Sequence, residues 1–166
     1  DAKVVDKDVK LPEERQTSAE TLEADTLAVL ADLNHASQKG LQTIFDSSVG
    51  RSTVNHPLGG RYQITPTEAS VQKLPVQHGV THTASVMAQG FNPYIAEWSP
   101  YHGAVYAVIE ATARLVAAGA NWSKARFSYQ EYFERMDKQA ERFGQPVAAL
   151  LGSIEAQIQL GLPSIG

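Results

Sequence analysis

The stretch from Gly90 to Gly119 constrains the fold most, because it joins an aromatic segment to the longest run with helical periodicity. Ser99 is a favourable N-cap, and Pro100 suits the first helical position, where its missing N–H would lack a partner anyway. Apolar side chains then recur every three or four residues, and Gly119 supplies a stop. The sequence predicts a helix from about Pro100 to Gly119 with one face in the core. The periodic positions are Val105, Val108, Ile109, Thr112, Leu115 and Val116.

The segment in front of this helix, residues 91–98, is a loop rich in Phe, Tyr and Trp. A loop of this composition is expected to pack under another element or to bind something. The opposite face of the predicted helix carries Glu110 and Arg114, one turn apart. From spacing alone, these two residues form a surface ion pair worth about 0.3 kcal/mol.

Length and composition favour one globular domain. The chain has 166 residues, of which 43% are hydrophobic and 19% are charged. These values allow one core and argue against wholesale disorder. The net charge is −4, and the basic residues form no block. We therefore expect neither nucleic acid nor an anionic membrane as a partner.

The chain contains no cysteine. This excludes disulfides, thiolate metal sites and thiol nucleophiles, and it fits a cytoplasmic protein. No apolar run approaches the roughly 20 residues of a membrane span. The chain also lacks an initiator Met and stops just after a predicted helix, so we expect it to be an excised piece of a larger protein.

The N-terminal part divides at residue 17. Residues 1–16 alternate charged and apolar side chains too weakly to distinguish an edge strand, a linker remnant and a flexible arm. Residues 17–166 are expected to form the single domain. Thr17 and Glu20 make a capping box before leucines at helical spacing, which predicts a helix to about Ala36.

The middle of the chain reads as short elements and loops. An apolar run at Leu41 predicts a turn of helix or a strand, and the Gly-rich segment 50–60 predicts a loop. Period-2 alternation predicts strands over 69–74 and 80–87. Residues 122–127 form a connector with room for a short strand.

Two further helices are predicted near the C-terminus. Ser128 and Glu131 form a capping box, and the helix that begins there is expected to end at Gly144. Pro146 opens the last helix, and Gly161 stops it. The sum is four helices around a few strands, an α+β or α/β layered domain. The apolar face of the last helix consists of Val147, Leu150, Leu151, Ile154 and Ile158.

Motifs for catalysis or metal binding are weak. Of the five histidines, only His78 and His82 have a suggestive spacing, and on a strand they would lie about 13 Å apart, too far to share an ion. The serine-hydrolase elbow, the Walker A loop and the dinucleotide fingerprint are all missing. From its position after Pro66 and Thr67, Glu68 is predicted to be a solvated loop carboxylate. The loop 50–60 is either a turn or a backbone segment that binds phosphate.

Several longer motifs, however, agree in order and spacing with one family. The run DSSVGRSTVNHPLGG at 46–60 resembles a D-x-x-V-G-x-x-T-V-x-x-P motif in the second half of phosphoribosylformylglycinamidine synthase, the glutamine-dependent ligase of purine biosynthesis. TPTEASVQKLP at 65–75 is similar to the family's acidic strand motif. The segments MAQGFNPYIAEWSPYHGAVYAVIEATARLVAAGA, SYQEYFERM and AALLGSIEAQIQLGLPSIG follow in the same order. The resemblance covers residues 27–166.

The resemblance implies a fold and a partner. The family's synthetase region has two related halves, and this chain is similar to the N-terminal α+β subdomain of the second half. Such subdomains pair through their sheets into a closed barrel. The chain alone would leave that sheet unpaired, so we expect a homodimer through the sheet. The remaining synthetase subdomains and the glutaminase domain would be its partners in the whole enzyme.

The implied reaction converts formylglycinamide ribonucleotide to formylglycinamidine ribonucleotide. ATP activates the amide oxygen, and ammonia from glutamine displaces phosphate. ATP or ADP and Mg²⁺ are thus implied cofactors of the full enzyme. The isolated piece is expected to be inactive and to bind none of them. No catalytic residue is assigned to it.

The resemblance also assigns roles to particular residues. Glu68 and Glu110 lie where the family has Mg²⁺-contacting carboxylates of an auxiliary nucleotide site. Arg114 stands where many relatives have Asn, and a cation there would repel Mg²⁺ and pair with Glu110. Arg51 and Thr53 are candidate contacts for substrate phosphate, or parts of a structural loop. Two alternatives stay open: a structural, pseudo-symmetric domain with a degenerate nucleotide site, and a free-standing small-molecule-binding domain.

Overall fold

The computed structural model describes residues 18–44 and 52–165. The N-terminal segment 1–16, with Thr17 and Arg51, lies outside these ranges. In chain order the elements are α1 (Leu22–Ala31), α2 (Lys39–Gln42), β1 (Leu58–Gly59), β2 (Thr65–Pro66), β3 (Ala69–Lys73), β4 (Ala84–Ala88), α3 (Pro93–Trp98), α4 (Pro100–Ala117), the 3₁₀ turn η1 (Trp122–Lys124) and α5 (Ala140–Leu160).

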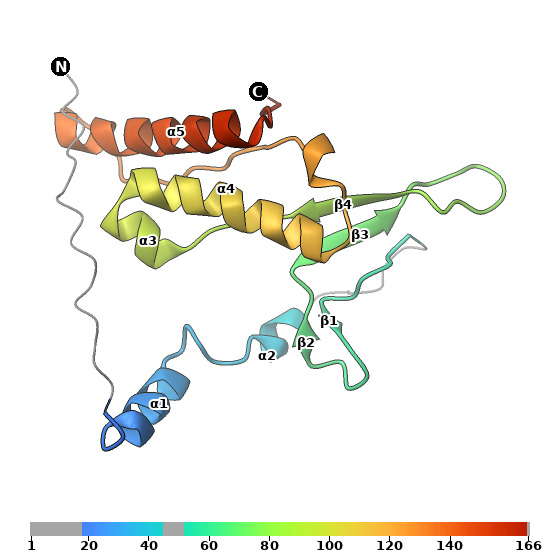
Figure 1. Ribbon diagram of the computed structural model, residues 1–166, viewed down its shortest axis with the longest axis horizontal. Coiled ribbons are helices and arrows are strands. Elements are labelled where there is room, and N and C mark those ends of the chain that lie inside the picture. The colour runs from blue at the N-terminus through green and yellow to red at the C-terminus, as the bar shows by residue number, and fades with distance from the viewer. Residues whose placement is uncertain (1–17, 45–51, 166) are drawn as a thin grey trace.

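Three layers make up the main body of the molecule. Helix α5 packs along α4, and α4 in turn contacts β4 of the β3–β4 sheet (Figure 1). Helix α3 packs beside α4, whereas α1 lies away from these layers. Both sheets of the described residues are two-stranded and antiparallel. The fold class is therefore α+β, and the α/β alternative, which needs parallel strands, is wrong.

Helix α4 confirms the strongest sequence prediction. The Ser99 hydroxyl accepts a hydrogen bond from the backbone N–H of His102, and Pro100 occupies the first turn. Val108 is 1% exposed and forms the centre of the core with Phe127, Ala156 and Leu162. Two members of the predicted stripe, Ile109 and Val116, are instead about half exposed. The buried face of α4 is thus narrower than the apolar face predicted from its sequence.

Helix α3 lies within the aromatic segment that was predicted to be a loop. The Asn92 side chain accepts hydrogen bonds from the N–H groups of Tyr94 and Ile95, and Pro93 takes the first helical position. This Asn-Pro start is the same cap signal that identified α4. The short helix was therefore recognisable from sequence, but its aromatic composition hid it.

Helix α5 overturns two boundary predictions. It begins at Ala140 and runs through Gly144 and Pro146, which were expected to stop one helix and open the next. Pro146 removes one backbone hydrogen bond, and Gly144 costs about 1 kcal/mol relative to Ala. Packing against α4 outweighs both, because the face turned inward consists of small residues. The predicted C-terminal stop is confirmed, since Gly161 adopts a left-handed conformation with φ of 67°.

The helix predicted from Ser128 towards Gly144 is also wrong, because residues 128–136 have no regular structure. The segment covers its aromatic side chains unevenly: Tyr129 stacks on Phe127, whereas Tyr132 is 87% exposed. An isolated helix of this length is marginal in water without a buried face. A good capping box therefore did not produce a helix here.

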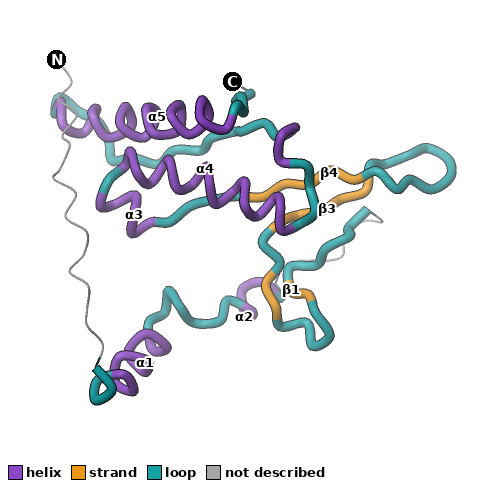
Figure 2. The backbone as a smooth tube through the Cα atoms, in the orientation of Figure 1, coloured by secondary structure: helices purple, strands orange, loops and turns teal. Residues whose placement is uncertain are grey.

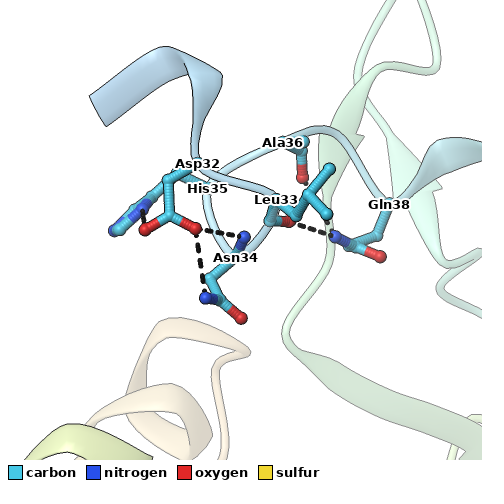
Figure 3. Close-up of polar contacts among 6 residues, drawn as sticks. All are labelled: Asp32, Leu33, Asn34, His35, Ala36 and Gln38. Atoms are coloured by element: carbon cyan, nitrogen blue, oxygen red, sulfur yellow. Dashed lines mark hydrogen bonds and ion pairs between the residues drawn. The ribbon is translucent and has the colours of Figure 1, made fainter. Parts of the chain in front are cut away.

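Helix α1 ends five residues before the predicted boundary, at Ala31 rather than Ala36. The Asp32 carboxylate accepts hydrogen bonds from the backbone N–H of Asn34 at 2.8 Å and from its side-chain amide at 3.1 Å (Figure 3). This turn competes with further helix. The same backbone N–H lowers the pKa of Asp32 below its usual value.

Strand β3 confirms the first predicted strand, with Val71 opposite Val86 of β4. Strand β4 starts at Ala84 rather than residue 80, and the chain between the strands forms a loop that projects from the sheet (Figure 2). Val54 N–H donates to the Val71 carbonyl at 2.9 Å, and Lys73 N–H donates to the Ser52 carbonyl at 2.7 Å. Residues 52–54 thus extend the sheet on the far side of β3. In the connector, the predicted strand is only a bridge between Phe127 and Ser164.

The core of the described residues is small. Six hydrophobic residues are buried, whereas thirty large hydrophobic side chains are exposed. A domain normally buries most of its large apolar side chains. The layers therefore leave much apolar surface exposed.

Candidate functional site

The structure brings together three of the residues that the resemblance assigns to one site. Arg114 Nη2 lies 2.9 Å from Glu110 Oε1, and Arg114 Nε lies 2.6 Å from Glu68 Oε2. The first contact is the predicted i,i+4 pair. The second joins α4 to the chain between β2 and β3. It is a close charge contact rather than a hydrogen bond, because the Nε–H has no aligned acceptor.

Backbone groups complete this cluster. Arg114 Nη1 donates to the carbonyl of Gln89 at 2.8 Å, and the N–H of Phe91 donates to Glu110 Oε2 at 2.8 Å. The guanidinium therefore contacts three acceptors, and Arg114 is 24% exposed. The arrangement fixes β3, the end of β4 and α4 relative to one another. Its net charge is −1, with two carboxylates around one cation.

Gly90 is the residue that makes this geometry accessible. A Cβ at position 90 would overlap the carbonyl oxygen of Ala107 and lie 2.7 Å from the backbone nitrogen of Ala111. Only glycine lets the chain that leaves β4 lie directly against the backbone of α4. Gln89 and Phe91 are thereby delivered to Arg114 and Glu110. Sequence reasoning missed these backbone partners, although a glycine between a strand and a helix signals such a close approach.

Beside the cluster is an open pocket of about 790 Å³. Glu68 and Arg114 form part of its wall, together with hydroxyl and amide side chains from β3 and the segment before β1. Its volume is within the usual range of small-molecule sites. The polar lining residues are Gln42, Thr53, Asn55, Thr67, Glu68, Ser70, Gln72, Gln89 and Arg114.

Thr53, one of the two candidate phosphate contacts, lies in this pocket. It pairs with Gln72 of β3 as a bridge, and its neighbour Ser52 donates a hydrogen bond from its hydroxyl to Gln72 Oε1 at 3.1 Å. Its position is thus fixed by the sheet. The other candidate, Arg51, lies outside the described residues. The structure therefore unites Thr53, Glu68, Glu110 and Arg114 in one region.

The carboxylates do not fit Mg²⁺ as they stand. A divalent cation binds carboxylates whose oxygens are free to approach it. Glu68 and Glu110 both contact the Arg114 guanidinium, and Glu110 also accepts the Phe91 N–H. A metal ion between them would lie against a positive charge. The chemistry of this set of residues is that of a cross-link between structural elements.

Histidines add nothing to this site. His78 and His82 lie in the loop between β3 and β4 rather than on a strand. His35 Nδ1 lies 3.5 Å from the Asp32 carboxylate at the end of α1 (Figure 3). Across residues 18–44 and 52–165, no three His, Cys, Asp or Glu side chains form a group able to hold a metal ion.

None of the compared family models, curated proteins or solved structures matches this chain. Among the helices that the structure describes, none is both long and apolar enough to cross a membrane. Any assignment of function therefore depends on the motifs in the sequence and on the geometry around Arg114.

Proposed function

We propose that this chain is part of the ATP- and glutamine-dependent ligase that converts formylglycinamide ribonucleotide to formylglycinamidine ribonucleotide in the cytoplasm. One observation supports this most. The motifs assign Glu68, Glu110 and Arg114 to a single site, although spacing alone made Glu68 a solvated loop carboxylate and the other two a surface pair. In the fold, all three meet at one guanidinium.

In this proposal the 166-residue chain is inactive alone, because the other synthetase subdomains and the glutaminase domain supply ATP, Mg²⁺ and ammonia. The test is to purify the gene product that contains this chain and to measure amidine formation with ATP, Mg²⁺ and glutamine. We expect turnover that depends on all three. A soluble, folded product without such turnover would refute the proposal, as would amidine formation by the isolated chain.

A second candidate is favoured by the specific contacts of Arg114. Because its guanidinium occupies both carboxylates, we propose that this domain serves the ligase as a pseudo-symmetric structural partner whose ancestral nucleotide site is degenerate. Calorimetric titration of the gene product with ADP and Mg²⁺ separates this role from nucleotide binding. Glu68→Gln and Glu110→Gln are expected to leave the ADP affinity unchanged. A loss of ADP binding in either variant would favour a working auxiliary site.

The homodimer through the sheet stays a prediction. In the described residues, β4 pairs only with β3, so its other edge is open to another strand. Met87 is a suitable probe, since it is two-thirds exposed on β4. We expect Met87→Glu to weaken self-association of the isolated chain if the sheets meet face to face. An unchanged sedimentation profile would count against pairing through that face.

A further inference from the structure

Helix α5 has two opposite faces, and the smaller side chains are turned inward. Its buried residues are Gly144, Ala148, Gly152, Ser153 and Ala156. A Cβ on Gly152 would overlap the carbonyl oxygen of Tyr101 and lie 2.9 Å from its carbonyl carbon. The small residues thus let α5 lie directly against α4.

The outer face of α5 carries the residues of the predicted apolar face, together with Phe143. We call this set the α5 stripe. Apart from the half-buried Val147, its members are between 40 and 69% exposed. Figure 1 shows α5 as the outermost layer, with α4 on one side only. A helix that is apolar on both faces is normally buried on both. The stripe consists of Phe143, Val147, Leu150, Leu151, Ile154 and Ile158.

The spacing of the stripe is the same in both directions. Its members follow one another at intervals of 4, 3, 1, 3 and 4 residues, so each has a counterpart equally far from the midpoint between Leu150 and Leu151. A second α5 that runs antiparallel about a two-fold axis at this midpoint would oppose Phe143 to Ile158 and Val147 to Ile154. An interface between identical copies requires a surface that is complementary to itself in this way.

We propose that the α5 stripe binds the α5 stripe of a second copy of this chain, antiparallel and about a two-fold axis between Leu150 and Leu151. The charges of α5 agree with this register. Glu155 would lie level with Pro146 of the other helix, and Arg142 level with Gln159, so no like charges meet. An unrelated partner would not require the stripe to be symmetric.

The size of the contact sets its strength. A helix of 21 residues is about 31 Å long and about 10 Å wide with its side chains. The footprint is about 300 Å² on each copy, which is well below the roughly 800 Å² per partner of a standard specific interface and corresponds to a weak, transient contact. The pair is therefore an exchanging dimer with a dissociation constant in the micromolar range rather than an obligate one.

Thiol cross-linking tests the register directly. The chain contains no cysteine, so introduced thiols are the only reactive ones. In the proposed pair, position 143 lies beside position 158 of the other copy, whereas the two residues at 143 are about 22 Å apart along the helices. We expect a mixture of Phe143→Cys and Ile158→Cys chains to form a cross-linked heterodimer with a short bismaleimide, and each variant alone to form little. Equal cross-linking of the single variants, or none in the mixture, would overturn the proposal.

Sedimentation equilibrium of the 166-residue chain measures the affinity, from about 1 µM to about 1 mM. Leu150→Glu places like charges at the two-fold axis. In a Met87→Glu background, where pairing through the sheet is already weakened, we therefore expect the dissociation constant to rise at least about 100-fold. Leu33→Glu, at an exposed position after α1, is the matched control and should change nothing. Circular dichroism verifies that each variant is folded. A chain that stays monomeric at the highest concentration, or a Leu150→Glu variant that associates like its Met87→Glu parent, would overturn the proposal.

Discussion

Replacement of Arg114 by methionine tests whether the cluster around it is a structural cross-link. Arg114→Met keeps an apolar stem of similar length but removes the guanidinium. The two ion pairs are partly exposed and are worth about 0.5 kcal/mol each. The hydrogen bond from a charged donor to the Gln89 carbonyl contributes about 1.5 kcal/mol. We therefore expect the free energy of unfolding to fall by about 2–3 kcal/mol.

The assay is urea denaturation at neutral pH, with Glu110→Gln added to both the wild type and Arg114→Met. Because Glu110 acts partly through Arg114, we expect a coupling energy of about 0.5–1 kcal/mol from this cycle. Arg142→Met is the comparison variant: Arg142 also contacts two carboxylates and donates to the Arg135 carbonyl at 3.2 Å, but these partners all lie in the exposed segment before α5. It should cost at most about 1 kcal/mol, because exposed contacts of this kind contribute little. Equal losses for Arg114→Met and Arg142→Met would refute the cross-link.

The same cluster predicts a gain of metal binding. Arg114→Asn leaves Glu68 and Glu110 without their cation, so Mg²⁺ at about ten times its dissociation constant should stabilise this variant by about 1.4 kcal/mol. The wild type should not respond. Thermal unfolding with and without Mg²⁺, with Ca²⁺ for comparison, measures the difference. Equal stabilisation of the wild type would show that Arg114 does not block the site.

Three other perturbations test the packing and burial. Gly152→Ala should lower the free energy of unfolding by about 2 kcal/mol, because the new Cβ would meet the backbone of Tyr101, which cannot move aside as a side chain can. Gly40→Ala is the control: a Cβ there has nothing within 4 Å, so it should be neutral or stabilising in the same urea assay. Val108→Ala, at the most buried core position, should cost about 2 kcal/mol in the free energy of unfolding. Burial raises the pKa of Tyr129 from 10.0 to about 12, so its folded form holds the proton more tightly than the unfolded chain. Its stabilising contribution is complete below about pH 10 and is lost as the pH rises towards about 12, and Tyr129→Phe should flatten that decline in the free energy of unfolding.

Local signals were reliable where packing agreed with them. The Ser99-Pro100 start of α4, the strand at β3 and the left-handed stop at Gly161 were all predictable. The capping box at Ser128 was not sufficient, because the segment after it leaves Tyr132 almost fully exposed instead of burying a helix face. Gly144 and Pro146 predicted a helix boundary that is not there. The contact with α4 keeps α5 helical through both residues.

Some contacts of the candidate site were predictable from sequence, and others were not. The motifs identified Thr53, Glu68, Glu110 and Arg114 as candidates, and spacing predicted the pair on α4. The sequence could not show that Glu68 reaches the same guanidinium, or that Gly90 brings two backbone groups to it, because these contacts depend on how β3, β4 and α4 lie together.

By itself, the sequence determined the helical periodicity of α4 and α5, the alternation of β3 and the symmetric spacing of the α5 stripe, since these are properties of neighbouring residues. Only the tertiary structure decided which face of each helix is buried. Small residues allow two helix backbones to approach closely, and in α5 this close contact with α4 placed the glycines and alanines inside. The leucines and isoleucines, which periodicity placed together on one face, therefore form the outer surface.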